Sequence, residues 1–283
     1  MATDSDLSRL ERLHLAIARR MNRDPWKRMS SFFSRNINGR GILALLGDNL
    51  HVDGWEYVRA MSPDRPILVV ANHRTFFDLF VVTALLLVRL GRPIRIYFPV
   101  RARYFYQTVG GMLLNAIGAH WSMYPPIFMG GSELDRGALD ELIGLCREGP
   151  GHVIGIHPEG TRNRNPDPYS LGKVQPGAGR IILAARPQVV PVFVAGISNH
   201  MWSVIRDARR RVNPVRVRFG PLLDLSQFDG LPMKGSSYKT VTDAVMERVR
   251  ELGEADRQAY ATSAPPGGAR SLRPDEGDSG SAA

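Results

Sequence analysis

The sequence predicts an α/β fold with a largely parallel central sheet flanked by helices, preceded by an amphipathic helical element. From about residue 64 onward, short apolar runs alternate with helical segments, which is the pattern of parallel strands joined by crossover helices. The chain has 283 residues, 43% of them hydrophobic, so it can bury a sizeable core. Its single cysteine, Cys146, excludes a disulfide framework, a zinc ribbon and an iron–sulfur centre.

Two basic amphipathic segments open the chain. Over residues 6–23, apolar side chains recur every three or four positions among arginines, which predicts a helix. Pro25 ends this helix, because the residue before a proline disfavours the helical conformation. Aromatic and basic side chains mix again over residues 26–37. These helices can pack on the rest of the fold, place apolar groups and arginines at an anionic membrane, or do both. We expect residues 1–45 to be a membrane-association segment.

The elements that follow predict one α/β domain over residues 46–260. Buried strands are expected at residues 66–71, 94–98, 152–157 and 189–195, and a half-exposed strand at residues 215–219. Helices are expected at residues 76–89, 104–116, 132–147, 178–186 and 236–252. Ser132 and Asp135 form a capping box at the start of the third of these helices. Residues 261–283 are rich in proline, glycine and serine, so we expect a disordered tail.

The charge of the chain indicates an anionic partner. Thirty-seven Lys and Arg against 27 Asp and Glu leave a net charge of +10, which suits nucleic acid, an anionic bilayer or a phosphate-bearing substrate. No nucleic-acid recognition motif accompanies the charge, so no nucleic-acid partner is expected. The best candidate for a membrane span, residues 79–88, is too short at ten residues. Without a secretory signal either, the sequence predicts a peripheral or monotopic protein at the cytoplasmic face of the membrane.

A first polar cluster, NHRTFFD, directly follows the predicted strand at residues 66–71. In an open α/β sheet, ligands bind beyond the carboxyl ends of the strands, which is where His73 would lie. Asp78, about one helical turn later, could reach back and fix the tautomer of the imidazole. The other ring nitrogen would then be free to take a proton from a hydroxyl. A capping histidine and an ordinary helix aspartate would give the same spacing.

A second polar cluster, PEGTR, follows the predicted strand at residues 152–157. Glu159 and Arg162 offer a hydrogen-bond acceptor and a bidentate anion-binding fork. Gly160 permits a tight turn and close approach of the backbone to a ligand. Lys173 precedes a helix opened by glycines, which suggests a second anion site at a helix N-terminus.

The histidines near the second cluster raise the question of a metal. His152, His157 and Glu159 could suggest a metal site, but residues five apart on a strand point to opposite faces. The two histidines therefore cannot readily share one ion, and we expect no metal. The chain also contains no G-x-S-x-G elbow, phosphate-binding loop or H-E-x-x-H motif.

Taken together, the two clusters resemble the motifs of the glycerolipid (1-acylglycerol-3-phosphate) acyltransferases. NHRTFFD is similar to the NHx4D motif of that family, and HPEGTR is similar to its F-P-E-G-T-R motif. The segment from Lys173 to Gly177 and the later Val-Pro-Val at residues 190–192 match further family blocks in order and spacing. The resemblance covers about residues 50–225. It implies transfer of a fatty acyl group from acyl-CoA or acyl carrier protein to a lysophospholipid hydroxyl, without a metal or redox cofactor.

The resemblance also implies roles for individual residues. His73 would be the general base and Asp78 its orienting partner, and no covalent acyl-enzyme would form. The polar head of the acceptor would be bound by Glu159, Gly160, Thr161 and Arg162. Family members are commonly held at the bilayer by an N-terminal helical element, in agreement with the basic segment at residues 1–45.

Two positions depart from the family pattern. Between the motifs the family carries an arginine that contacts the acceptor phosphate, and Tyr124 stands there instead, which removes a contact worth about 1.5 to 3 kcal/mol. Arg101 or Arg103 could supply the contact from another direction. Otherwise the acceptor is a different lyso-lipid, such as a lyso-aminolipid, or the protein binds lipid without catalysis, although the intact first motif argues against that. His157 stands in place of the usual Phe.

Overall fold

The computed structural model describes residues 7–128 and 133–263, and it confirms the α/β fold. A six-stranded sheet has the order β1-β8-β7-β2-β6-β3, and its pairs are parallel except for β7 with β8. Its strands are β1 (Leu50–Asp53), β2 (Ile67–Ala71), β3 (Arg95–Tyr97), β6 (His152–Ile156), β7 (Gln188–Ala195) and β8 (Val215–Phe219). The short strands β4 (Val100–Arg101) and β5 (Pro126–Ile127) pair separately.

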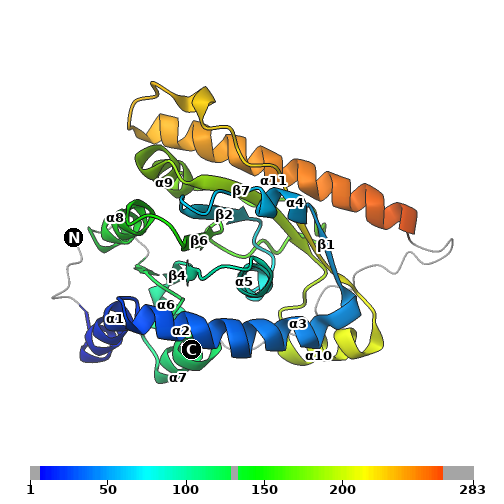
Figure 1. Cartoon of the computed structure of the whole chain (residues 1–283), viewed down its shortest axis with the longest axis horizontal. Coiled ribbons are helices and arrows are strands. Elements are labelled where there is room, and N and C mark those ends of the chain that lie inside the picture. The colour runs from blue at the N-terminus through cyan, green and yellow to red at the C-terminus, as the bar shows by residue number, and fades with distance from the viewer. Residues whose placement is uncertain (1–6, 129–132, 264–283) are drawn as a thin grey trace.

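Helices cover both faces of the sheet (Figure 1). The helices after β1 are α4 (Trp55–Arg59), α5 (Asp78–Arg89), α6 (Ala102–Phe105), α7 (Val109–Leu113), α8 (Glu133–Arg147), α9 (Gly177–Ala185), α10 (Met201–Arg210) and α11 (Gly235–Ser263). One face carries α8, α9 and α11, and the other carries α5, with the N-terminal helices packed outside α5.

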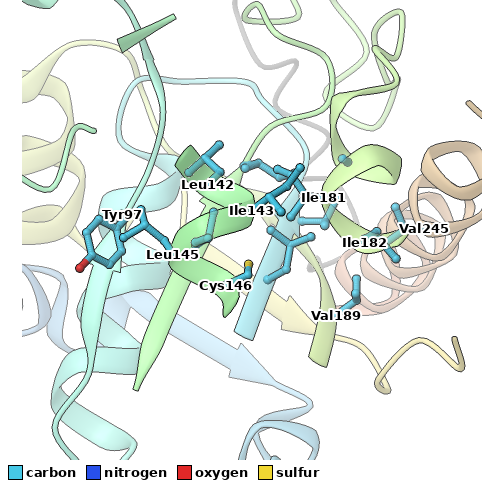
Figure 2. Close-up of a cluster of buried hydrophobic side chains, with 14 of the residues drawn as sticks. Tyr97, Leu142, Ile143, Leu145, Cys146, Ile181, Ile182, Val189 and Val245 are labelled. Carbon is cyan, nitrogen blue, oxygen red and sulfur yellow. The ribbon is translucent and has the colours of Figure 1, made fainter. Parts of the chain in front are cut away.

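The two faces of β2 belong to two separate cores. Leu68 and Val70 pack with α8, α9 and α11, while Ile67, Val69 and Ala71 pack with α5. Figure 2 shows the first of these cores, where side chains of α8 such as Leu142 and Cys146 lie beside those of α9. Because both faces of the strand are buried, it reads in the sequence as a continuous apolar run.

The N-terminal segment packs against the α/β domain through a buried lysine. It consists of α1 (Arg9–Met21), α2 (Trp26–Phe33), a π-helical segment (Ser34–Gly39) and α3 (Arg40–Leu46). Lys27 of α2 is fully buried and donates from Nζ to Asn22 Oδ1 at 2.9 Å and to the carbonyl oxygen of Ile96 at 2.5 Å. Its Nζ also lies 4.1 Å from the centre of the Tyr97 ring. Burial holds the pKa of Lys27 well below its usual value.

The helix predicted over residues 104–116 is broken in the structure. It divides into α6, α7 and a π-helical turn (Leu114–Gly118). Thr108 caps α7 by accepting a hydrogen bond from the backbone N–H of Gly111 at 3.0 Å. A Cβ at Gly111 would lie 2.5 Å from the carbonyl oxygen of Tyr104, so this glycine lets two short helices meet closely.

The last helix continues beyond its predicted end at residue 252. It has 29 residues and includes 261–263, so the first three residues of the predicted tail are helical. Asp256 holds this extension on the sheet, because its carboxylate accepts hydrogen bonds from Arg216 Nε at 2.9 Å, Arg218 Nε at 3.0 Å and Tyr169 Oη at 3.2 Å. The rest of the predicted tail, residues 264–283, and the capping residue Ser132 lie outside the described residues.

Replacing Asp256 by Ala should destabilise the protein strongly. The change would leave two arginines without the buried carboxylate that pairs with both, a loss that typically costs about 3 to 5 kcal/mol. Urea denaturation monitored by circular dichroism measures this cost. Asp243→Ala on the same helix is the matched control, since its exposed pair with Lys239 is worth less than about 1 kcal/mol. Equal effects of the two changes would contradict a structural role for Asp256.

Candidate active site

His73 and Asp78 come together at the carboxyl end of β2. The chain leaves the strand at Ala71 and turns into α5, whose first residue is Asp78. The Asp78 carboxylate is buried and accepts hydrogen bonds at 2.7 Å from the backbone N–H groups of Arg74 and Thr75 and from the Thr75 hydroxyl. His73 Nδ1 lies 3.5 Å from Asp78 Oδ2, slightly beyond hydrogen-bond distance. A small rotation of the ring would bring these two atoms within hydrogen-bond distance.

Glu159 connects the first motif to the second. Its Oε1 accepts from the backbone N–H of His73 at 2.8 Å, and its Oε2 accepts from the backbone N–H of Gly172 at 2.6 Å. The side chain is only 3% exposed, and burial raises its pKa. The family resemblance implies that Glu159 helps to bind the polar head of the acceptor. In the structure each of its two oxygens accepts a hydrogen bond from a backbone N–H, so Glu159 joins the loops after β2 and β6.

His157 stacks on the His73 ring. The ring centres are 4.0 Å apart and the planes differ by 4°. His157 Nδ1 lies 3.1 Å from the carbonyl oxygen of Ala71, which fits a neutral ring donating its N–H to that oxygen. Burial, reinforced by the neighbouring His73, lowers the pKa of His157 to about 3. The catalytic candidate is therefore packed against an imidazole that stays uncharged near neutral pH.

His73, Asp78 and His157 do not form a convincing metal site, although their ligand atoms lie within 4.8 Å of one another. A metal ion binds in the plane of each imidazole at about 2.1 Å from the nitrogen. These two rings are parallel and stacked, so an ion in the plane of one would lie well outside the plane of the other. Asp78 also already accepts three hydrogen bonds.

Two of the predicted basic residues meet at the second motif. Arg101 Nε donates to the carbonyl oxygen of Gly160 at 3.1 Å, and Arg162 is exposed with its Nη1 3.1 Å from Asn199 Oδ1. Gly160 lies in the turn of the second motif, and its φ of 65° is the left-handed conformation that glycine allows.

The other predicted binding residues are more peripheral. Thr161 is exposed on the second motif, Lys173 is exposed beside Gly172, and Arg103 is exposed on α6. Of the glycines after Lys173, Gly179 is needed for the packing of α9 on α11. The Gly179 N–H donates to Thr242 Oγ1 at 2.8 Å, and a Cβ there would collide with the backbone of α11.

Tyr124, which stands where the family carries an arginine, offers no polar group at the surface. Its side chain is buried, its hydroxyl donates to the carboxylate of Glu141, and burial raises its pKa. Two further residues near the site, Arg74 and Asn199, make contacts that the sequence did not indicate. Arg74, inside the first motif, donates from Nη2 to the Asn165 carbonyl at 2.7 Å, while its Nη1 is buried without a partner among the described residues.

His157 should make the protein less stable in acid. Its pKa in the folded state lies below the ordinary value of 6.5, so the unfolded chain binds the proton first as the pH falls. Stability is then lost between about pH 6.5 and pH 3, with about 2 kcal/mol gone at pH 5 relative to pH 7. His157→Phe should remove that part of the pH dependence in urea unfolding, whereas a change at exposed His51 should not. Unchanged pH dependence in His157→Phe would contradict this assignment.

The chain is similar to known acyltransferases. The acyltransferase family model matches residues 49–195, more than half of the chain and inclusive of both motifs. A curated relative, a 1-acyl-sn-glycerol-3-phosphate acyltransferase of Chlamydomonas reinhardtii, is 26% identical over 219 residues, which are 76% of this chain. The chain spans about half the length of that relative, 54% of it.

A solved structure has the same fold. The crystal structure of the 1-acyl-sn-glycerophosphate (LPA) acyltransferase PlsC from Thermotoga maritima is similar with a TM-score of 0.52 and 18% identity. The likeness covers 90% of this chain and 98% of that one. On the match of the family model over both motifs, the chain belongs to the acyltransferase family of enzymes.

Proposed function

We propose that this acyltransferase moves a fatty acyl group from acyl-CoA or acyl carrier protein to the free hydroxyl of 1-acylglycerol-3-phosphate. The observation that carries the proposal is the position of His73 at the end of β2. Its ring lies beside the Asp78 carboxylate, and its backbone N–H donates to the Glu159 carboxylate. The Chlamydomonas relative and the Thermotoga protein are both named as acyltransferases of this acceptor, which supports the same substrate.

In the proposed mechanism His73 acts as a general base without a covalent acyl-enzyme. Nδ1 faces Asp78, so Nε2 takes the proton of the acceptor hydroxyl as its oxygen attacks the thioester carbonyl. The Asp78 carboxylate stabilises the imidazolium that results. The tetrahedral intermediate collapses with cleavage of the carbon–sulfur bond, and the leaving thiolate takes the proton back from His73. Neutral His157 packs on the ring without adding a charge that would oppose its protonation.

The basic residues at the second motif suit the phosphate of the acceptor. Arg162 presents an exposed guanidinium beside the loop, and Arg101 approaches the same loop from β4. Arg74 adds a guanidinium from the first motif, with one nitrogen free of partners among the described residues. Guanidinium groups bind phosphate oxygens in pairs, so this arrangement can compensate for the arginine that Tyr124 replaces.

Aromatic side chains next to His73 offer an apolar surface for the acyl chain. Phe76 and Phe77 follow the histidine within the motif and are partly exposed. Phe76 packs against Phe80 with ring centres 5.0 Å apart and against Phe105 at 5.7 Å. An acyl chain lying along these rings would bring its thioester carbon towards the base.

We further propose that one face of the molecule rests on an anionic membrane. Phe32 and Ile37 in the N-terminal segment are 62% and 57% exposed, and Leu113 and Ile117 on the neighbouring helical segment are 51% and 70% exposed. Asn38 ties the two segments together by donating to the carbonyl oxygens of residues 117 and 118. Among residues 7–128 and 133–263, no helix is both long and apolar enough to cross a bilayer. An apolar face with interspersed arginines suits the bilayer interface.

Replacing His73 by Ala should lower kcat by about two to four orders of magnitude, the usual contribution of a general base. Transfer from labelled acyl-CoA or acyl carrier protein into lysophosphatidic acid, lysophosphatidylglycerol and a lyso-aminolipid measures the effect. The exposed His51→Ala variant is the control and should keep full activity. Full activity in His73→Ala would end the mechanism, and product with a lyso-aminolipid alone would keep the mechanism but change the acceptor.

Arg162→Ala should weaken binding of the phosphorylated acceptor selectively. Loss of a charge-assisted contact of about 1.5 to 3 kcal/mol raises KM for lysophosphatidic acid by about 10-fold to 150-fold. The rate with 1-acylglycerol, which lacks the phosphate, should change little. An equal loss with both acceptors would show that Arg162 acts on the loop and not on the phosphate.

A further inference from the structure

A second basic cleft lies away from the active site. It has a volume of about 460 Å³, within the range of small-molecule sites, and lies between α2 with the start of the π-helical segment, the last turn of α5 and the start of β3. Four arginines line it: Arg28, Arg35, Arg92 and Arg95. Its apolar wall includes Phe32, Leu87 and Ile94.

The cleft and His73 lie at opposite ends of the strands. β2, β6 and β3 are parallel, so their first residues lie at one end of the sheet and their last residues lie at the other. Arg95 begins β3, whereas His73 follows the end of β2. A strand of five residues separates the two ends by about 16 Å. A ligand in the cleft therefore would not be the acyl acceptor bound at the motifs.

The arginines of the cleft carry more positive charge than the surrounding residues neutralise. Asp24 pairs with two of them, Arg28 Nε at 2.9 Å and Arg95 Nη2 at 2.8 Å. The Arg35 side chain makes no hydrogen bond or ion pair with any residue that the structure describes. Arg92 donates only to a backbone carbonyl at 3.3 Å, and its Nε is buried without a partner among the described residues.

The environment of Arg92 also favours an added anion. Burial lowers the pKa of Arg92, and the charge of Asp64 opposes this only in part. Removing a guanidinium from water without a paired anion costs free energy, which a bound phosphate would recover. Arg35 and Arg92, which lack carboxylate partners, can donate paired hydrogen bonds to one phosphate.

We propose that this cleft binds the phosphate of an acidic membrane phospholipid, with the glycerol and acyl portion lying over Phe32. Inorganic phosphate would pair with the arginines but would make no contact with the apolar wall. Phe32, which is 62% exposed, belongs both to this cleft and to the face proposed to rest on the membrane. A lipid drawn partly from the bilayer would thus satisfy the charge and the apolar surface at once.

Binding of short-chain lipids to the full chain, measured by calorimetry without an acyl donor, tests the proposal. Dihexanoyl-phosphatidylglycerol should bind at one saturable site that Arg35→Gln/Arg92→Gln weakens by about 30-fold, as expected for two arginines near a lipid headgroup. Arg248→Gln/Arg250→Gln on the opposite side of the molecule removes the same charge and should have little effect (Figure 1). Dihexanoyl-phosphatidylcholine, with no net charge, should bind more weakly.

Further variants separate the possible sources of the phosphate and the possible sites. Phe32→Ser should weaken binding of the lipid and leave binding of inorganic phosphate unchanged. Arg162→Ala and His73→Ala should bind the lipid as the unaltered protein does, so a failure of the proposed acyl transfer would leave this result standing. Binding of inorganic phosphate alone, loss of lipid binding in Arg162→Ala, or equal losses in the two double variants would overturn the proposal.

Discussion

The arrangement of the active site depends on one buried carboxylate. Glu159 accepts the backbone N–H of His73 with one oxygen and that of Gly172 with the other. A second link supports it, because the Asn163 N–H donates to the carbonyl oxygen of His73 at 2.7 Å. The loops after β2 and β6 are thereby held as one unit, and the backbone of the catalytic candidate is fixed from two sides. A buried acceptor that serves two N–H groups is costly to replace, because each donor loses its partner in an apolar setting.

The groups next to the His73 ring differ in charge. Asp78 accepts three hydrogen bonds from its own turn, and these hold its carboxylate beside His73. Neutral His157 fills the space on the other side of the ring. Arg162 lies on the loop after β6, and Arg101 of β4 donates to the Gly160 carbonyl of the same loop.

Sequence patterns predicted the parts of the structure that follow from burial and strand direction. β2, β6 and β7 are buried on both faces and read as apolar runs, and parallel strands place both polar clusters at one edge. The clamp that Glu159 forms between the loops after β2 and β6 could not be predicted in this way, because it depends on an N–H group 13 positions later in an irregular loop. The length of α11 likewise depends on Asp256 meeting arginines of β8. Helix α10 was not predicted, because arginines interrupt its short run of apolar residues at helical spacing.

Amide hydrogen exchange combined with steady-state kinetics of Glu159→Gln tests the central role of the clamp most directly. The amide group of Gln replaces one acceptor oxygen by a donor, so one of the two backbone N–H groups loses its partner. The account predicts faster exchange at His73 or Gly172 and a fall in kcat, with little change in KM for the lyso-lipid. Unchanged exchange together with a large rise in KM would contradict it, because Glu159 would then act on the substrate and not on the loops.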